Sequence, residues 1–120
     1  MNILHLLEPS DSLVKKHLTQ HLHKELKARK TRSGFTLSKA VASGVKNRDS
    51  SIGIYAGDEE SYTIFAELFD PIISDYHRYA GGQAASDFTL PDIPNPDPDG
   101  RYVLSTRIRL ARNLKGFSFP

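Results

Sequence analysis

Apolar residues recur at intervals of three or four between residues 13 and 26, with lysines in many of the gaps. This spacing predicts one amphipathic helix, because positions three or four apart share a helix face. Ser10 and Asp11 come just before the pattern and are good N-cap residues, so the helix is predicted to begin after them. The apolar positions are Leu13, Val14, Leu18, Leu22 and Leu26.

Two further helical patterns follow. Thr36 is a suitable N-cap for a short helix over residues 37–43, and Gly44 stands where glycine often ends a helix. The acids at residues 58–60 favour a helix N-terminus, because negative charge complements the helix dipole there. The strongest apolar stripe comes next, and Asp70 with Pro71 predicts two abutting helices with a bend. Its members, expected in the core, are Tyr62, Phe65, Leu68, Phe69, Ile72, Ile73 and Tyr76.

The pattern changes again after a stretch rich in proline and glycine. Residues 102–111 alternate between apolar and other side chains with a period of two, which predicts a strand. Arg107 and Arg109 share one face of it, about 6.6 Å apart. Both guanidinium groups would therefore reach one polyphosphate, to which arginine donates paired hydrogen bonds.

These elements predict an all-α fold class for the first part of the chain. Residues 1–80 form a small helical bundle, residues 81–101 a Pro/Gly-rich linker, and residues 102–120 the start of a second domain. A lone strand is not stable in water, so the last segment is expected to need further chain or a partner.

Composition narrows the class of protein. The chain has 120 residues, enough for one domain and part of another, with 38% hydrophobic and 25% charged residues. It contains no cysteine and no apolar run near the ~20 residues of a membrane span. The first residues lack the basic and small-residue features of a secretory signal. We therefore expect a cytoplasmic protein without a membrane partner.

Charge is segregated along the sequence. Residues 15–48 carry ten Lys or Arg and one acid, residues 49–100 eleven acids and one base, and residues 101–116 five bases and no acid. The first block is typical of solvent-exposed helix faces. Nucleic-acid binding is not expected, because aromatic residues are not interleaved with the lysines and arginines. His17, His21 and His23 lack a suitable third ligand, so no metal site is predicted.

The loop between the second and third helical patterns is the first candidate for function. Residues 45–57 lose the helical period and combine small polar residues and glycines with Ile52, Ile54 and Tyr55. Loops held between rigid elements commonly carry binding residues.

Three segments resemble one known family. YVLSTRIRLARNLKG at residues 102–116, GDEESYTIFAELFDPIISDYH at residues 57–77 and SGFTL at residues 33–37 resemble the ATP:guanido phosphotransferases, or phosphagen kinases. The resemblance implies reversible transfer of the ATP γ-phosphoryl group to a guanidino nitrogen, with Mg²⁺ accompanying ATP or ADP. It also implies a helical N-terminal domain followed by a larger α/β catalytic domain.

The resemblance assigns roles to residues. The segment of the family that binds ATP phosphates matches Ser105, Thr106, Arg107, Ile108 and Arg109. No catalytic residue is expected within these 120 residues, because the family's catalytic carboxylates and reactive cysteine belong to the later domain. The chain alone is therefore expected to be inactive, and its oligomeric state stays open.

The loop at residues 49–55 resembles the family's guanidine-specificity loop in its arginine-kinase form. By that similarity the amides of Ser51, Ile52 and Gly53 hold the substrate carboxylate, Tyr55 donates its hydroxyl and Ser50 meets the amino end, with Ile54 in the same segment. Arginine kinases usually have Gly where this chain has Ser51, so taurocyamine, creatine or another guanidino acceptor stays open.

Two other classes of protein stay in view. A guanidino-compound-binding or regulatory module would keep the fold without the chemistry. Bacterial protein-arginine kinases share a segment like STRIRLAR but lack a helical N-terminal domain, so residues 1–80 argue against them.

Overall fold

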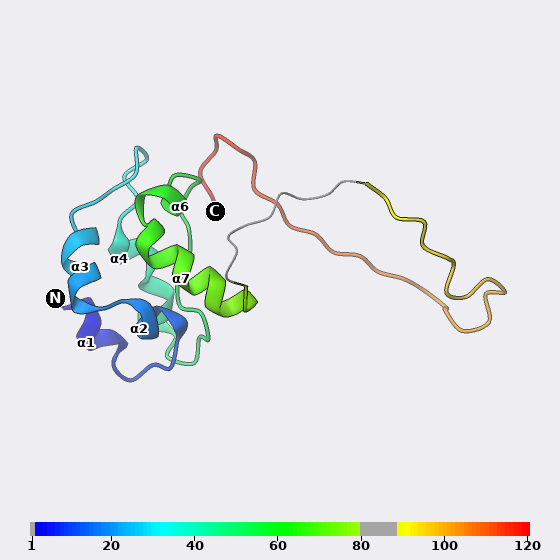
Figure 1. The fold of residues 1–120 in the computed structure, drawn as a ribbon, viewed down its shortest axis with the longest axis horizontal. Coiled ribbons are helices and arrows are strands. Elements are labelled where there is room, and N and C mark those ends of the chain that lie inside the picture. The colour runs from blue at the N-terminus through cyan, green and yellow to red at the C-terminus, as the bar shows by residue number, and fades with distance from the viewer. Residues whose placement is uncertain (1, 80–88) are drawn as a thin grey trace.

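Helix α7 (Ala66–His77) is the longest helix in residues 2–79 and 89–120, which are the residues that the computed structural model describes. Shorter helices pack around it into one body (Figure 1). The all-α prediction for this part of the chain is confirmed. None of the helices in the described ranges is long and apolar enough to cross a membrane. The other helices are α1 (Ile3–Leu7), α2 (Leu13–His17), α3 (Gln20–Leu26), α4 (Leu37–Ala40), α5 (Ala42–Lys46) and α6 (Ser61–Ile64).

The core draws apolar side chains from most of these helices and from one loop. Phe65, Leu68, Phe69 and Ile72 of the predicted stripe are buried, whereas Tyr62 and Tyr76 at its edges are exposed. Tyr62 still contacts Phe69 edge-on, with ring centroids 5.3 Å apart. The other buried apolar residues are Leu7, Val14, Leu18, Leu26, Leu37, Ala40, Val41 and Ile54.

The helix predicted over residues 13–26 is divided in two. Leu18 leaves the helical conformation at ψ 88°, and the Thr19 hydroxyl accepts a hydrogen bond from the Leu22 N–H at 3.2 Å, so Thr19 begins α3 as its N-cap. The N-cap of α2 is Ser12, not Ser10 or Asp11. Ser10 supports this cap, because its hydroxyl donates to the Ser12 hydroxyl at 2.8 Å.

Two other predicted boundaries were wrong. Gly44 does not end a helix but lies inside α5, where lack of a side chain matters for packing. The break near Pro71 falls instead at Phe65, between α6 and α7, and α7 continues through the proline. Phe65 is fully buried. The two helices therefore meet at a residue whose side chain lies in the core.

Ion pairs join the basic and acidic blocks of the sequence. Two of them connect α2 to α7. The other two connect the segment after α3 to α7 and to the residue just before α6. Many of the segregated charges are therefore paired with opposite charges inside the folded body. An ion pair contributes more to stability where its partners are partly buried, because exposed pairs are weakened by water and salt. The pairs are Lys16–Asp75 (2.6 Å), His17–Asp75 (2.8 Å), Arg29–Glu67 (2.9 Å) and Arg32–Glu60 (3.2 Å).

Residues 89–120 form an extended arm that contains neither helix nor strand. The arm runs far out from the helical body and returns to it (Figure 1), where the Phe119 N–H donates to the Gly57 carbonyl at 3.0 Å. The strand predicted over residues 102–111 is thus absent. A strand needs a neighbour for its backbone groups, and none lies beside this segment in the described part of the chain.

Candidate functional site

The loop from residue 47 to residue 57 rests on the start of helix α2. The Leu13 N–H donates to the Ser51 carbonyl at 2.8 Å, and the Val14 N–H donates to the Ile52 carbonyl at 3.0 Å. N–H groups in the first turn of a helix have no partner within that helix. The loop therefore caps α2 with two of its own carbonyl groups.

The other side of the loop lies against helices α4 and α5. The Gly44 N–H donates to the Gly53 carbonyl at 3.2 Å, and the Tyr55 N–H donates to the Ala40 carbonyl at 2.9 Å. Gly53 has φ +80°, which favours glycine, and a Cβ there would lie 2.8 Å from Val14 Cγ1. The loop is thus fixed from both sides.

Several groups of this loop remain available for a ligand. The N–H groups of Ser51 and Ile52 have no hydrogen-bond partner among residues 2–79 and 89–120. The Gly53 N–H, in contrast, already has a partner, because it donates to the Ser50 hydroxyl at 3.2 Å. Tyr55 is 66% exposed, so its hydroxyl is open to solvent. Backbone N–H groups next to a free phenol suit a small molecule with a carboxylate.

The structure brings the six predicted loop residues together but gives them different surroundings. Ser51 and Tyr55 are exposed, whereas Gly53 is buried. Ile54 is also buried and belongs to the core, so its side chain holds the loop down. Its contribution to a ligand site would be confined to its backbone.

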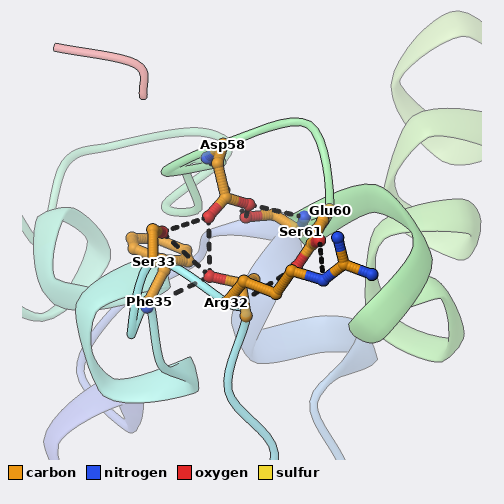
Figure 2. A network of polar contacts seen from close by, with 7 residues as sticks. Arg32, Ser33, Phe35, Asp58, Glu60 and Ser61 are labelled. Atoms are coloured by element: carbon orange, nitrogen blue, oxygen red, sulfur yellow. Dashed lines mark hydrogen bonds and ion pairs between the residues drawn. The ribbon is translucent and has the colours of Figure 1, made fainter. Parts of the chain in front are cut away.

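A polar network around Asp58 anchors the end of the same loop (Figure 2). One carboxylate oxygen accepts from the Ser61 N–H at 2.9 Å and the Ser61 hydroxyl at 3.0 Å. The other accepts from the Thr31 hydroxyl at 2.6 Å and from the Ser33 hydroxyl. Next to it, the Glu60 carboxylate accepts from the Arg32 N–H at 2.9 Å.

The network determines the protonation of Asp58. Burial acts to raise the pKa of this carboxyl, but hydrogen bonds from Ser33, Thr31 and Ser61 outweigh burial and hold the pKa below its ordinary value. In the sequence, Asp58 indicates only an acid near a helix start. The Asp-x-x-Ser spacing to Ser61 was a signal for the local half of the network.

The predicted nucleotide-binding segment lies on the arm. Ser105, Thr106, Arg107, Ile108 and Arg109 are all exposed. No hydrogen bond or ion pair in the described part of the chain joins them to the loop at residues 47–57. The two candidate sites are therefore separate in this structure.

No group of three or more His, Asp or Glu in residues 2–79 and 89–120 is arranged to hold a metal ion. The histidines considered as ligands have other neighbours. His17 Nε2 lies 2.8 Å from an Asp75 carboxylate oxygen, and His21 Nε2 lies 3.7 Å from a Glu25 carboxylate oxygen. Both of these histidines thus face a carboxylate.

The N-terminal part of the chain matches a known family. Residues 8–74 match the model described as "ATP:guanido phosphotransferase, N-terminal domain". An arginine kinase of Eriocheir sinensis is 46% identical over 112 residues, which cover 90% of this chain and 31% of the relative. An arginine kinase of Anthopleura japonica is 50% identical over 111 residues, covering 89% of this chain and 16% of the relative. The chain thus spans a third or less of the length of these relatives.

Several solved structures share the fold, and two of them illustrate its extent. A lombricine kinase matches 68% of this chain and 23% of its own, with 37% identity and a TM-score of 0.63. The substrate-free duplicated taurocyamine kinase from Schistosoma mansoni matches 98% of this chain and 18% of its own, with 30% identity and a TM-score of 0.75. The second match extends over the arm as well as the helical body.

Proposed function

Because the chain belongs to the ATP:guanido phosphotransferase family through the N-terminal domain at residues 8–74, we propose that it is the N-terminal region of an arginine-phosphorylating phosphagen kinase. The proposed reaction is reversible transfer of the γ-phosphoryl group of ATP, bound with Mg²⁺, to a guanidino nitrogen of L-arginine. The single observation that carries it is the doubly anchored loop with its free amide groups.

The loop would bind the end of the substrate that does not react. The amides of Ser51, Ile52 and Gly53 would donate to its carboxylate and the Tyr55 hydroxyl would add a further hydrogen bond, while Ser50 would meet its amino group. Such contacts hold the acceptor so that its guanidino nitrogen lies in line with ATP, and orientation is a large part of catalysis in phosphoryl transfer.

The arm would supply a first part of the ATP site. Arg107 and Arg109 would donate to ATP phosphates and offset negative charge during transfer, with Ser105, Thr106 and Ile108 in the same segment. We divide the chain into a helical domain at residues 1–80, a linker at residues 81–101 and a segment of the catalytic domain at residues 102–120. The cytoplasmic location stays a prediction.

Arginine is the proposed acceptor because several of the most similar relatives are named arginine kinases. The solved structures named lombricine kinase and taurocyamine kinase keep other guanidino acceptors in view. The proposal therefore needs an acceptor comparison.

A chimera tests the function. This chain would replace the matching N-terminal third of the Eriocheir sinensis arginine kinase, and ADP release would be measured with arginine, taurocyamine, lombricine and creatine. We expect arginine to give the highest kcat/KM, with kcat within about tenfold of the parent enzyme. A folded chimera that used none of the four acceptors would refute the proposal, and a preference for another acceptor would refute its substrate.

A further inference from the structure

Helix α2 contacts the loop at residues 47–57 through backbone groups of its first turn. Leu13 and Val14 are the first two residues of the helix, and both of their N–H groups are given to loop carbonyls. The side chain of Ser12 caps the same turn, accepting from the Lys15 N–H at 3.4 Å. The helix start is therefore fully engaged within the protein and binds no ligand itself.

These two hydrogen bonds determine which way the loop amides face. In a trans peptide the C=O of one residue and the N–H of the next point in opposite directions. With the Ser51 carbonyl directed at α2, the Ile52 N–H points away from it. With the Ile52 carbonyl directed at α2, the Gly53 N–H also points away.

We propose that the backbone N–H groups of Leu13 and Val14 are positioning groups for substrate recognition. They turn the free Ile52 N–H, and the Gly53 N–H that donates to the Ser50 hydroxyl, toward the side of the loop where the acceptor's carboxylate would bind. This inference rests on the proposed function, because it assumes that these amides bind that carboxylate. It adds a role for α2, whose first-turn N–H groups are all bonded within the protein.

The opposite face of the loop supports this arrangement. A Cβ on Gly44 would lie 2.6 Å from the Gly53 carbonyl oxygen and 2.9 Å from Gly53 Cα. The loop can therefore neither rotate into α5 nor lift off α2 without losing a backbone hydrogen bond. Donors held this way need little reorganisation when a ligand binds.

The chain permits a substitution that removes one positioning N–H and keeps the helix. Proline lacks an N–H group but suits the first position of a helix, which Leu13 occupies. Ser12 has φ −68° and ψ 156°, the conformation that a residue before proline prefers. Leu13→Ala is the matched control, because it loses the same side chain but keeps the N–H.

The test is an amide NMR titration of the 120-residue chain with L-arginine and with agmatine, which is arginine without its carboxylate. We expect Leu13→Pro to reduce the advantage of arginine over agmatine about threefold to tenfold, the worth of one hydrogen bond, and Leu13→Ala to preserve it. A general loss of stability would weaken both ligands alike. An unchanged advantage in folded Leu13→Pro would overturn the inference.

Two other results also test the inference: failure of Leu13→Pro to fold, and absence of arginine binding at the loop. If Leu13→Pro does not fold, Gly44→Ala takes its place against Lys46→Ala, and the same loss of arginine advantage is expected; its absence would overturn the inference. If arginine leaves the Ser51, Ile52 and Gly53 signals of the unsubstituted chain unmoved, the proposed loop site fails and the inference fails with it. That failure shows before any substitution is made.

Discussion

At the scale of single residues, Tyr55 has a fixed backbone and a free side chain. Its N–H is bonded to the Ala40 carbonyl, while the phenol stands in solvent. The preceding residue, Ile54, is buried in the core and anchors the loop there. This combination suits a residue that must present one hydroxyl at a constant place.

Tyr55→Phe should therefore weaken acceptor binding without unfolding the protein. We expect KM for arginine in the chimera to rise about threefold to tenfold, because one hydrogen bond is lost, with little change in kcat. Tyr76→Phe on α7 is the control, since that side chain is also exposed and lies outside the loop. Equal KM values for the two variants would contradict a role for the Tyr55 hydroxyl.

Asp58 should matter for stability rather than for binding. Asp58→Ala leaves the Thr31 and Ser61 hydroxyls without their acceptor, and we expect unfolding free energy to fall by about 1–3 kcal/mol. Glu59→Ala changes the neighbouring exposed acid and should cost far less. Chemical denaturation of the 120-residue chain at neutral pH provides the measurement.

The pH dependence of that effect has a definite sign. The pKa of Asp58 is held below its ordinary value in the folded chain, so its stabilisation is complete above about pH 4 and is lost as pH falls through the folded pKa. The difference in melting temperature between the unsubstituted chain and Asp58→Ala should shrink on acidification. A difference that grew at low pH would contradict the assignment.

The sequence was enough to place residues 50–55 in one loop, whereas half of the Asp58 network could not be predicted from it. The role of the loop residues in binding stays a prediction. Thr31 and Ser33 lie more than twenty residues before Asp58 and meet it only after folding. No local pattern carries that information.

At the scale of helices, apolar spacing predicted which residues are buried better than where each helix ends. Thr19 divides a continuous apolar stripe because its hydroxyl caps α3, and period alone cannot show which of several polar residues will do this. The helix break predicted at Pro71 is absent. The proline lies in the second turn of α7, and the helix continues through it.

Gly44 supports a prediction at this scale. In an ordinary helix interior, Gly→Ala stabilises by about 0.5–1 kcal/mol. Here the added methyl group meets the Gly53 carbonyl, so Gly44→Ala should instead destabilise by about 1–3 kcal/mol, the usual cost of overpacking. Thermal unfolding beside Lys46→Ala, an exposed site on α5, measures the sign. A gain in stability would contradict this prediction, because it would mean that the Gly53 backbone moves away at little cost.

At the scale of the whole molecule, the helical body and the arm differ in what holds them. The body has a buried core and ion pairs, whereas most of the arm's side chains are exposed. Within the arm, Asp97 accepts hydrogen bonds from the N–H groups of Arg101, Tyr102 and Val103. These contacts order one turn but bury little surface.

Limited proteolysis should reveal this difference. Trypsin is expected to cut first after Arg101, Arg107, Arg109 and Arg112, because exposed backbone without secondary structure fits a protease most easily. A resistant fragment containing residues 2–79 should remain, as mass spectrometry would show. Early cleavage after Arg29 or Arg32, which are ion-paired, would contradict the division.

The isolated chain should show no turnover with ATP and arginine, because neither candidate site contains a group that could complete phosphoryl transfer. A coupled ADP assay measures this, with the chimera as the positive control. Turnover by the purified 120-residue chain, lost on Tyr55→Phe, would overturn the expectation.

The pairing of basic and acidic blocks has a consequence for biosynthesis. When residues 1–50 have left the ribosome, the emerged chain carries most of the body's cations, while Glu60, Glu67 and Asp75 are still to come. Phe65, Leu68 and Ile72, which complete the core, arrive with the same late segment. The body can therefore complete its fold during translation only after α7 has emerged, and until then its basic residues lack their partners within the chain.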